Sequence, residues 1–413
     1  MPSHLWLPFT QMAEFDARER TFVAARGTEL YDARGRTLFD AISSVWVTIH
    51  GHSHPAIVEA IARQAATLDH ATALGASNPV AEELALRLAR LSGLDYAFFS
   101  SDGASAIEAA LKMVLQYWRS AGNPKRVKFA HLTASYHGDT AAAMSLSDIP
   151  VFKRNFGALC FETIETVSLE AVLARDDIAA LVVEPIVQAA AGMRVVPQGW
   201  YAALASAAAT SPAQRPLLVV DEIATGFGRT GTFFAYEQLG LAPDLVCVGK
   251  GITGGSLALS ATLATRRIYE AFLGDARDAR QFFHGHSYAA NPIACAAALA
   301  SLELFETEAT LAHVAVLESA LERALGPLRT HPLVGEIRRA GLMCGIELRP
   351  PAEASYRTSF AWHVASELYE HGHFTRPIGD TIQLVPPLSS SVAELEAFVA
   401  ALPDALEGVP VRA

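Results

Sequence analysis

Short apolar runs alternate with segments of helical periodicity through the middle of this sequence. In the segment after the first run, Ile107, Leu111 and Val114 recur at the three- and four-residue spacing that places side chains on one helical face. Such alternation favours right-handed crossovers and a mostly parallel sheet covered by helices on both faces. The sequence therefore predicts an α/β fold that binds ligands beyond the carboxyl ends of its strands. The predicted strands are 96–100, 127–131, 178–184, 217–221 and 245–248.

The pattern changes after about residue 310. Helical periodicity returns at 311–328 and 359–371, an alternating segment covers 334–348, and a short strand is predicted at 382–385. Ser391 and Glu394 have capping-box spacing at the start of a last helix. We predict a large domain over 56–310 and a smaller α+β domain that combines 1–55 with 311–413. The stretch 206–216 is predicted to be a loop.

Composition narrows the class of function. At 413 residues and 51% hydrophobic, the chain can bury a large core, and its length suggests two or three domains. A formal net charge of −11 argues against nucleic acid or an anionic membrane as the main partner and favours a small molecule. We find no signal peptide and no apolar run long enough to span a membrane. Four widely spaced cysteines in apolar surroundings indicate reduced thiols in a cytoplasmic protein, neither disulfides nor a zinc site: Cys160, Cys247, Cys295 and Cys344.

Lys250 stands directly after the predicted strand 245–248. Burying an ammonium is costly unless it is paired or neutralised, so the alternatives are a solvated loop lysine and a lysine placed for chemistry. Only five of the 32 basic residues are lysines, and the other 27 are arginines, which cannot lose a proton near neutral pH. The other four lysines lie in polar turns or within an amphipathic helix. We therefore favour a chemical role for Lys250.

Four other features lie at predicted strand ends or helix starts. Gly103 and Ala104 open the helix after the first strand, where free N–H groups suit a phosphate. Asp221 ends a strand and could hold a protonated pyridine nitrogen, cap a helix or pair with an arginine. Tyr136 could stack on a flat ring, or belong to an ordinary turn. Ser287 precedes a long helix and could reach a phosphate. With Lys250 forming an imine, these residues suit pyridoxal phosphate.

The motifs that carry these residues resemble a known family. "DEIATGFGRTG", 29 residues from Asp221 to Lys250 in "GKGITGG", and "HGHSYAANP" are similar to class III pyridoxal-phosphate aminotransferases of fold type I, over residues 5 to 400. "HLWLPFTQM", "SSVWVTIHGHSHP", "QYW", "YHGDTAAAMSLSD" and "TRPIG" resemble the branch of that class that serves biotin biosynthesis, the diaminopelargonate aminotransferases.

The resemblance implies a role for each matching position. Lys250 would be the Schiff-base lysine and proton carrier, Asp221 would pair with the ring nitrogen, and Tyr136 would lie over the ring. Gly103 and Ala104 would hold the phosphate, joined by Ser287 from the second subunit of a homodimer with shared sites. The small-molecule substrates would be an amino donor and a keto acceptor. The positions expected near these substrates are Phe9, Val45, Trp46, Asp139, Arg229, Gly285 and Arg376, the last as partner of the acceptor carboxylate.

Two departures from the family pattern leave the amino donor open. The family usually has tyrosine where this chain has Phe9, and often tryptophan where it has Val45. Losing a hydroxyl and an indole removes a hydrogen bond and a stacking surface for adenosylmethionine, so lysine becomes an alternative donor. Ala104 lacks a hydroxyl that is frequent in the family, which removes one phosphate contact.

Other functions remain to be weighed against this prediction. Within the fold, the alternative is another class III transaminase that acts on ω-amino acids or amines, and a more distant one is a cofactor-binding protein without turnover. A serine hydrolase is excluded because "GHSHP" and "GHSYA" lack the G-x-S-x-G elbow. His50, His52 and His54 have no carboxylate or cysteine nearby at ligand spacing, so no metal is expected.

Overall fold

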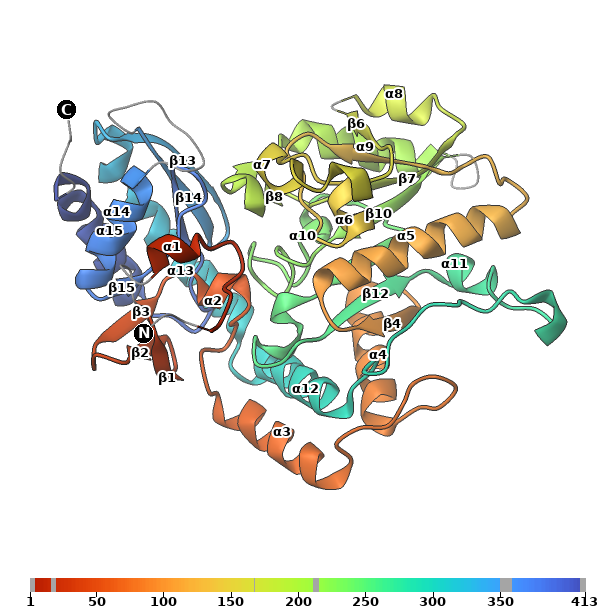
Figure 1. The fold of residues 1–413 in the computed structure, drawn as a ribbon, viewed down its shortest axis with the longest axis horizontal. Coiled ribbons are helices and arrows are strands. Elements are labelled where there is room, and N and C mark those ends of the chain that lie inside the picture. Colours follow the sequence, from red (N-terminus) through yellow and green to blue (C-terminus); the bar gives the residue numbers. More distant parts are fainter. Residues whose placement is uncertain (1–3, 16–19, 167, 211–214, 350–358, 409–413) are drawn as a thin grey trace.

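A seven-stranded sheet forms the centre of the fold in the computed structural model, which describes residues 4–15, 20–166, 168–210, 215–349 and 359–408 (Figure 1). Within these residues, β12 is antiparallel to both of its neighbours and the other strands of the sheet share one direction. The link from β11 to β12 contains only a 3-10 helix, η4 (Lys250–Thr253), so the chain returns antiparallel without a crossover. The order is β4 (Tyr96–Ser100), β12 (Ser260–Ala264), β11 (Leu245–Val248), β10 (Leu217–Asp221), β7 (Ile178–Val183), β5 (Lys128–Leu132) and β6 (Ile164–Thr166).

Both faces of this sheet are covered. Every residue of β7, β10, β11 and β12 is buried. Leu217 and Val219 belong to the core cluster beneath α5, whereas Leu218 and Val220, on the opposite face of β10, belong to the cluster that includes α4 and α12. The predicted α/β fold with a mostly parallel, helix-covered sheet is therefore confirmed. These helices are α5 (Gly103–Ser120), α4 (Pro79–Ser92) and α12 (Pro292–Thr307), and α3 (Pro55–Thr67) packs on α12.

The predicted element bounds agree closely with the structure. The strands 96–100, 217–221 and 245–248 are confirmed. β5 begins and ends one residue later than predicted, and β7 ends one residue earlier. One prediction is wrong in part: residues 206–210 belong to α9 (Gln198–Thr210), because their alanines favour a helix. Residues 211–214 of that predicted loop lie outside the described residues.

Segments from both ends of the chain meet beside the large sheet (Figure 1). β15 (His373–Phe374) pairs in parallel with β3 (Thr37–Asp40), in a sheet that continues into β2 (Glu29–Asp32) and β1 (Phe22–Arg26). This pairing supports joining the N-terminal segment to the C-terminal domain, whose bounds at 1–55 and 311–413 stay a prediction. The alternating segment forms a hairpin of β13 (Val334–Ala340) and β14 (Met343–Leu348), and β14 also pairs with β16 (Thr381–Leu384).

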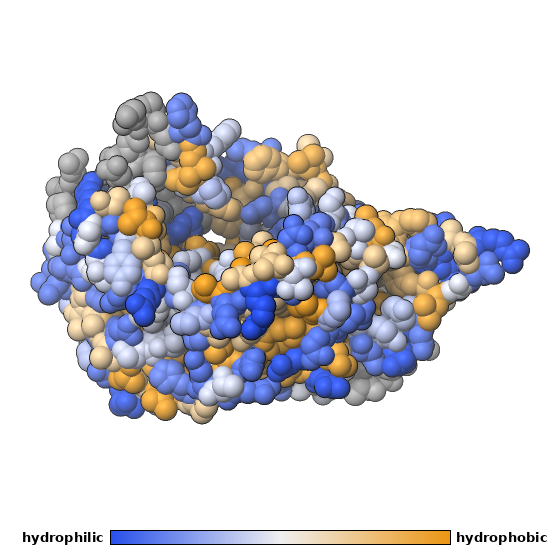
Figure 2. Space-filling model, turned by 90° about the horizontal axis from the view of Figure 1, so that it is seen from below, coloured by the Kyte–Doolittle hydropathy of each residue, from blue (hydrophilic) through white to orange (hydrophobic). Residues whose placement is uncertain are grey.

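The last helix, α15 (Val392–Glu407), begins as predicted. Ser391 Oγ accepts the N–H of Glu394, and the Glu394 carboxylate accepts the N–H of Ser391, so the capping box is confirmed. None of the described helices combines the length and apolar character needed to cross a bilayer. Seen from below, polar and apolar areas are interspersed over the surface, and a narrow projection leaves the body at one end (Figure 2).

The remaining elements are two longer helices and a set of short helices and strands. The longer ones are α13 (Thr310–Leu325) and α14 (Ser359–Glu370), which are close to the predicted helices 311–328 and 359–371. The others are α1 (Met12–Phe15), α2 (Ser43–Trp46), α6 (Ala141–Ser145), α7 (Pro150–Lys153), α8 (Leu169–Leu173), α10 (Ala235–Gln238), α11 (Arg266–Glu270), β8 (Val187–Gln188), β9 (Arg194–Val195), η2 (Gly157–Leu159), η3 (Ala189–Ala191), η5 (Ala276–Asp278) and η6 (Pro327–Thr330).

Candidate active site

A cavity of about 430 Å³ lies at the carboxyl ends of β5, β7, β10 and β11. This is the edge of a parallel sheet where ligands bind in folds of this type. The volume falls in the range typical of small-molecule sites. It is lined by Trp46, Asp102, Gly103, Ala104, Tyr136, His137, Gly138, Asp139, Thr140, Glu184, Ala189, Ala190, Asp221, Ile223, Ala224, Thr225 and Lys250.

Lys250 lies just beyond the carboxyl end of β11, and its side chain lines the cavity. Its φ of 42° is in the left-handed region, so the chain turns sharply here, and a Cβ on the following Gly251 would lie 2.9 Å from Ile49. Burial and the charge of Arg229 lower the pKa of Lys250, while the carboxylates of Asp221 and Glu184 oppose that shift. The Nζ atom lies 5.1 Å from the centre of the Trp46 ring. The site therefore favours a neutral amine more than water does.

Asp221 is held by a histidine from another strand end. Its Oδ2 lies 2.7 Å from His137 Nδ1, and its Oδ1 accepts the N–H of Ile223 at 3.1 Å. Because a carboxylate only accepts, Nδ1 carries the hydrogen of this bond. Burial lowers the pKa of His137, but the hydrogen bond to Asp221 and the charges of Asp221 and Glu184 outweigh burial and leave that pKa raised. His137 Nε2 is buried and has no partner among the described residues.

Tyr136 forms hydrogen bonds to two acidic residues of the cavity lining. Its hydroxyl donates to Asp139 Oδ2 at 2.8 Å, and its N–H donates to Glu184 Oε2 at 3.0 Å. Burial and the nearby charge of Asp139 raise the pKa of Tyr136, so the phenol stays protonated. The Tyr136 ring also packs edge-on against the ring of Phe152, with the two ring centres 5.8 Å apart.

Glu184 is a site residue that our sequence analysis did not assign. It directly follows β7, as Asp221 ends β10, and burial raises the pKa of its carboxyl to about 7. Its main-chain carbonyl accepts the hydroxyl of Tyr201 at 2.6 Å. The signal in the sequence was a charged residue closing an apolar run, which is the same signal that drew attention to Asp221.

The first turn of α5 provides a phosphate cradle. Asp102 caps the helix by accepting the N–H of Ser105 at 3.0 Å, while the earlier N–H groups of a helix have no intrahelical partner. Gly103 is needed for close packing, since a Cβ there would lie 2.8 Å from Ile223 Cγ2. A Cβ on Gly138 would lie 2.5 Å from that of Ala104, so both positions permit the two segments to approach. The dipole and free N–H groups at this end favour an anion.

The predicted substrate residues do not all line the cavity. Trp46 and Asp139 do. Phe9 is 56% exposed and contacts Phe152, which in turn contacts Tyr136. Val45 is 43% exposed, next to Trp46. Within the described residues, the Arg376 guanidinium has no hydrogen-bonding or ionic partner, and its main-chain carbonyl accepts Gln383 Nε2.

Arg229 is a predicted substrate residue that lies outside the cavity lining. Its Nη1 donates to the carbonyl of Pro386 at 2.6 Å and its Nη2 to that of Thr48 at 2.8 Å, and the side chain is fully buried outside the cavity lining. Burial lowers the pKa of Arg229 to about 9. Two of the three guanidinium nitrogens thus bind main-chain carbonyls, and the predicted substrate contact of Arg229 stays a prediction. In this structure Arg229 joins the segments that carry Thr48 and Pro386, and its charge lowers the pKa of Lys250.

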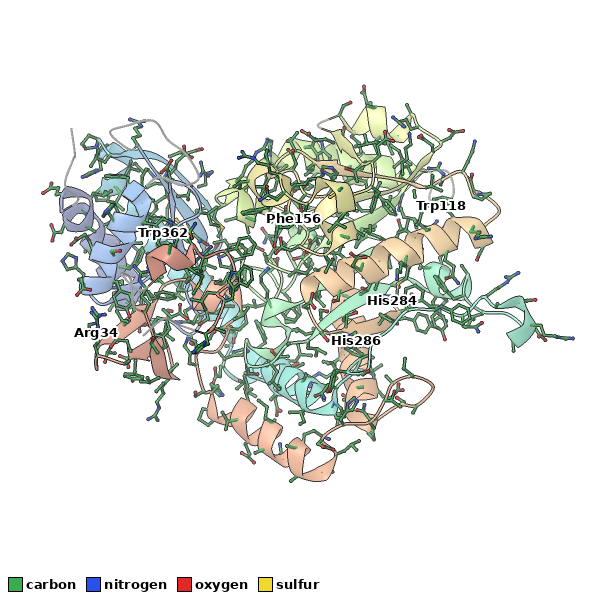
Figure 3. All side chains as sticks on the ribbon, in the orientation of Figure 1. Arg34, Trp118, Phe156, His284, His286 and Trp362 are labelled. Atoms are coloured by element: carbon green, nitrogen blue, oxygen red, sulfur yellow. The ribbon has the colours of Figure 1, made fainter. Side chains whose placement is uncertain are left out.

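Ser287 and Gly285 lie on an exposed segment that runs past the cradle, outside the cavity lining. Between them, His286 Nε2 lies 3.2 Å from Ser101 Oγ, and His284 Nδ1 lies 3.2 Å from Lys112 Nζ. Figure 3 shows these two histidines on the strip of chain beside α5. The segment is thus tied to the start of α5, while Ser287 itself points to solvent in the single chain.

The three clustered histidines have separate partners. His50 contacts Ser301, His52 contacts Asp40 and His54 contacts Glu308. Among the described residues, no three histidine, cysteine, aspartate or glutamate side chains are grouped so that they could hold a metal ion.

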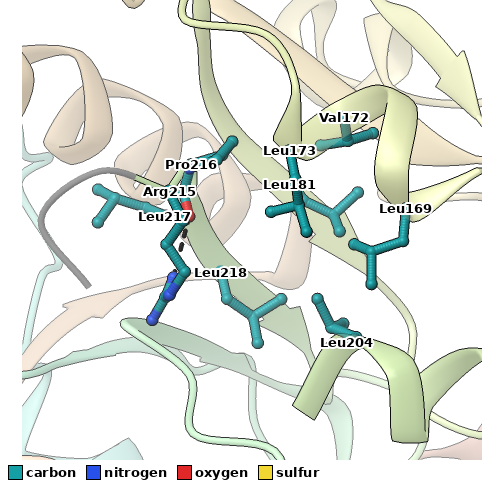
Figure 4. A pocket seen from close by; sticks show the side chains of 9 residues that line it. All are labelled: Leu169, Val172, Leu173, Leu181, Leu204, Arg215, Pro216, Leu217 and Leu218. Atoms are coloured by element: carbon teal, nitrogen blue, oxygen red, sulfur yellow. Dashed lines mark hydrogen bonds between the residues drawn. The ribbon is translucent and has the colours of Figure 1, made fainter. Parts of the chain in front are cut away.

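A second hollow is too small for a ligand. It encloses about 10 Å³ between leucines of β7, β10, α8 and α9, with Arg215 bonded to the neighbouring Pro216 carbonyl at its edge (Figure 4). This volume is about one water molecule, and its lining is apolar, so it is a packing gap in the core.

The residues of the large cavity fit pyridoxal phosphate. An anion cradle, a carboxylate aimed into the cavity and an amine with a lowered pKa match its phosphate, ring nitrogen and carbonyl. Fold and site together define a pyridoxal-phosphate-dependent transferase of fold type I. The chain belongs to the class-III aminotransferase family, whose model matches residues 14–406.

Individual relatives agree with this assignment. The chain is 41% identical to an adenosylmethionine-8-amino-7-oxononanoate aminotransferase of Nitratidesulfovibrio vulgaris, over 96% of this chain and 79% of the relative. The solved structure of the Methanocaldococcus jannaschii enzyme of the same name matches with a TM-score of 0.93 and 35% identity, covering 98% and 97% of the two chains. An amine transaminase from an uncultivated Pseudomonas species matches with a TM-score of 0.90 and 30% identity over 98% of each chain.

Proposed function

We propose that this aminotransferase converts 8-amino-7-oxononanoate to 7,8-diaminononanoate in biotin biosynthesis. The relatives named for that acceptor support the proposal. The structural observation that carries it is the Arg376 guanidinium, which has no partner within the described residues and belongs to a segment linked through Gln383 to the cavity residue Trp46. A guanidinium without a partner suits an acceptor that carries a carboxylate at the far end of its chain.

Each half of the reaction would use the same residues. Pyridoxal phosphate supplies an electrophilic carbon and a ring that accepts the electron pair released when a substrate carbon loses its proton. Lys250, with its lowered pKa, would take that proton and return it at the neighbouring carbon. Asp221, oriented by His137, would hold the ring nitrogen protonated, and the start of α5 would bind the phosphate. The donor would leave as its oxo product before the acceptor binds.

A homodimer with shared sites is part of the proposal. Ser287 is exposed in the single chain, yet its segment is held beside the cradle by the His286–Ser101 contact, which suits a hydroxyl directed into a second subunit. Large apolar side chains are exposed on and near that segment, including Phe283 at 74% and Tyr288 at 65%. We also propose a cytoplasmic location, which the buried free thiols of Cys247, Cys295 and Cys344 favour.

The amino donor would be adenosylmethionine or lysine. Phe9 lacks a hydroxyl, and its ring packs on Phe152, so it offers the donor an apolar edge only. To decide, the visible absorbance of the cofactor-loaded enzyme should be followed while each amine is added separately. Loss of the cofactor band with one amine and not the other identifies the donor.

The second candidate is an amine transaminase, which the likeness to the Pseudomonas enzyme favours. Enzyme that has already taken the amino group from its donor should be mixed with 8-amino-7-oxononanoate. In a separate experiment it should be mixed with a ketone of similar length that lacks the carboxylate. Diaminononanoate formation at a much higher rate supports the proposed function. Equal rates, or turnover of simple ω-amines alone, would favour the amine transaminase.

A further inference from the structure

Trp46 stands at the end of an unusual stretch of backbone. Ser43, Ser44, Val45 and Trp46 have φ values of 49°, 49°, 66° and 69°, a left-handed turn made without glycine. Residues with a Cβ are strained in this region, and a β-branched valine more than most. Such strain persists only where surrounding contacts over-determine it, and it is concentrated at functional sites. Separate sets of hydrogen bonds hold the two ends of this turn.

The first end is anchored by a buried carboxylate. Asp40 Oδ1 accepts the N–H of Ile42 at 3.3 Å, and its Oδ2 accepts Ser44 Oγ at 3.1 Å and faces His52 Nε2 at 2.8 Å. Ser43 Oγ donates to the carbonyl of Val385 at 2.6 Å. These bonds fix where the turn starts but do not touch the indole of Trp46.

The second end is anchored by Gln383 of β16, which is 2% exposed. Its Oε1 accepts the indole N–H of Trp46 at 2.7 Å, and its Nε2 donates to the carbonyl of Arg376. An indole N–H only donates and a carbonyl only accepts, so the amide has one orientation that satisfies both partners. The side chain is therefore locked between them, and Thr375 Oγ1 holds its main-chain carbonyl at 2.7 Å.

We propose that Gln383 is a positioning residue that sets the separation between Trp46 and the Arg376 segment, and thereby selects acceptors with a distant carboxylate. This inference rests on the proposed function. Trp46 lines the cavity, with its ring centre 5.1 Å from Lys250 Nζ. Under the proposed function, Arg376, which is not part of the cavity lining, binds the carboxylate at the far end of the acceptor. The Gln383 amide ties the main chain of Arg376 to the Trp46 indole, so it would set how far from Trp46 the Arg376 side chain starts and thereby the length of acceptor that fits. Gln383 itself does not line the cavity and would not touch substrate.

The test uses the cofactor-loaded enzyme and three variants. Gln383→Leu removes both bonds at similar size, and Gln383→Glu keeps an acceptor for Trp46 but loses the amide N–H that Arg376 receives. The control is Thr381→Val on the same strand, which removes a buried hydroxyl bonded to Arg338 instead. For each, KM and kcat are measured with 8-amino-7-oxononanoate and with a ketone of similar length that lacks the carboxylate.

We expect Gln383→Leu to raise KM for the carboxylate-bearing acceptor about tenfold, the effect of one or two lost neutral hydrogen bonds, with kcat changed far less. The preference for the carboxylate-bearing over the carboxylate-free acceptor should fall by a similar factor. Gln383→Glu should also raise KM for the carboxylate-bearing acceptor. Thr381→Val should keep the wild-type KM and the wild-type preference between acceptors. The absorbance of the bound cofactor should be the same in the wild type and in all three variants. Combining Gln383→Leu with Trp46→Phe should cost little more than the worse single change, because both remove the same bond.

Other outcomes overturn the inference. An unchanged KM, or equal losses with both acceptors, means that Gln383 only supports the fold. If the wild-type enzyme does not aminate 8-amino-7-oxononanoate, the proposed function fails, and Gln383 is then tested on accepted ketones with and without a terminal carboxylate. A wild type that shows no preference for the carboxylate refutes the role of Gln383 as well, whereas a preference lost in Gln383→Leu supports it.

Discussion

His137 Nδ1 lies 2.7 Å from Asp221 Oδ2, in a pair whose side chains are 0% and 5% exposed. The two residues come from the ends of different strands, and each satisfies a polar atom of the other that water does not reach. A buried carboxylate left without such a donor would be costly, so His137 both stabilises and orients Asp221.

The first prediction concerns this pair. Replacing His137 with phenylalanine should lower kcat by about 10- to 100-fold, because Asp221 loses a charge-assisted hydrogen bond and the alignment that comes with it. The measurement is steady-state turnover together with the dissociation constant of pyridoxal phosphate. His137→Asn, whose amide can still donate, should recover part of the loss; equal defects in both variants would contradict the orientation argument.

The second prediction concerns the pH dependence of stability. Burial raises the pKa of Glu222 to about 8, and its oxygens accept Thr225 Oγ1 at 2.6 Å and the N–H of Tyr236 at 2.8 Å. The folded state keeps the Glu222 proton up to about pH 8, whereas the unfolded chain loses it near its ordinary pKa. Between these values unfolding releases a proton, so this contribution to stability is present at low pH and is lost as the pH rises.

Glu222→Gln should remove that contribution. Thermal unfolding of wild type and variant should be compared from pH 5 to pH 9. As the pH rises toward 8, the Tm of the variant should increase relative to the Tm of the wild type. The comparison cancels titrations common to both proteins, including those of His50 and His131, whose pKa values burial lowers to about 4. A difference in Tm that is constant across this range would mean that Glu222 is already ionised in the folded state.

The third prediction concerns Lys250. Lys250→Ala should lose the visible band of covalently bound cofactor and at least about 100-fold of activity, since both the covalent attachment and the proton carrier are removed. Lys128→Ala is the matched control, because Lys128 forms only a partly exposed ion pair with Asp177. If Lys250→Ala retained the band, the central assignment of the site would be wrong.

The fourth prediction concerns the phosphate cradle. In Gly103→Ala the new methyl group would lie 2.8 Å from Ile223 Cγ2, so the turn or the side chain must move. We expect pyridoxal phosphate to bind about tenfold more weakly, measured by equilibrium dialysis, because displaced N–H groups no longer converge on the phosphate. Adding Ile223→Ala, which removes Cγ1, Cγ2 and Cδ1 together, should recover part of the affinity if crowding is the cause. No recovery would mean that contact with Ile223 is not the cause.

The sequence determined the site where its residues stand at strand ends. Lys250, Asp221, Tyr136 and Gly103 each follow an apolar run, and the carboxyl ends of parallel strands meet at one edge of a sheet, so their convergence could be predicted. The same reasoning predicted the helix-covered sheet and the capped start of α15, because periodicity and local capping report directly on burial and backbone bonding.

Only the tertiary structure decided which polar atoms meet. His137 reaches Asp221 across 84 residues of sequence, and Gln383 reaches Trp46 across 337. Arg229 binds the carbonyls of Thr48 and Pro386, both distant from it in the sequence. Periodicity shows which side of an element is buried, whereas a buried polar group must find its partner wherever the packed chain presents one. Those pairings depend on the positions of distant segments, and they exist only in the folded protein.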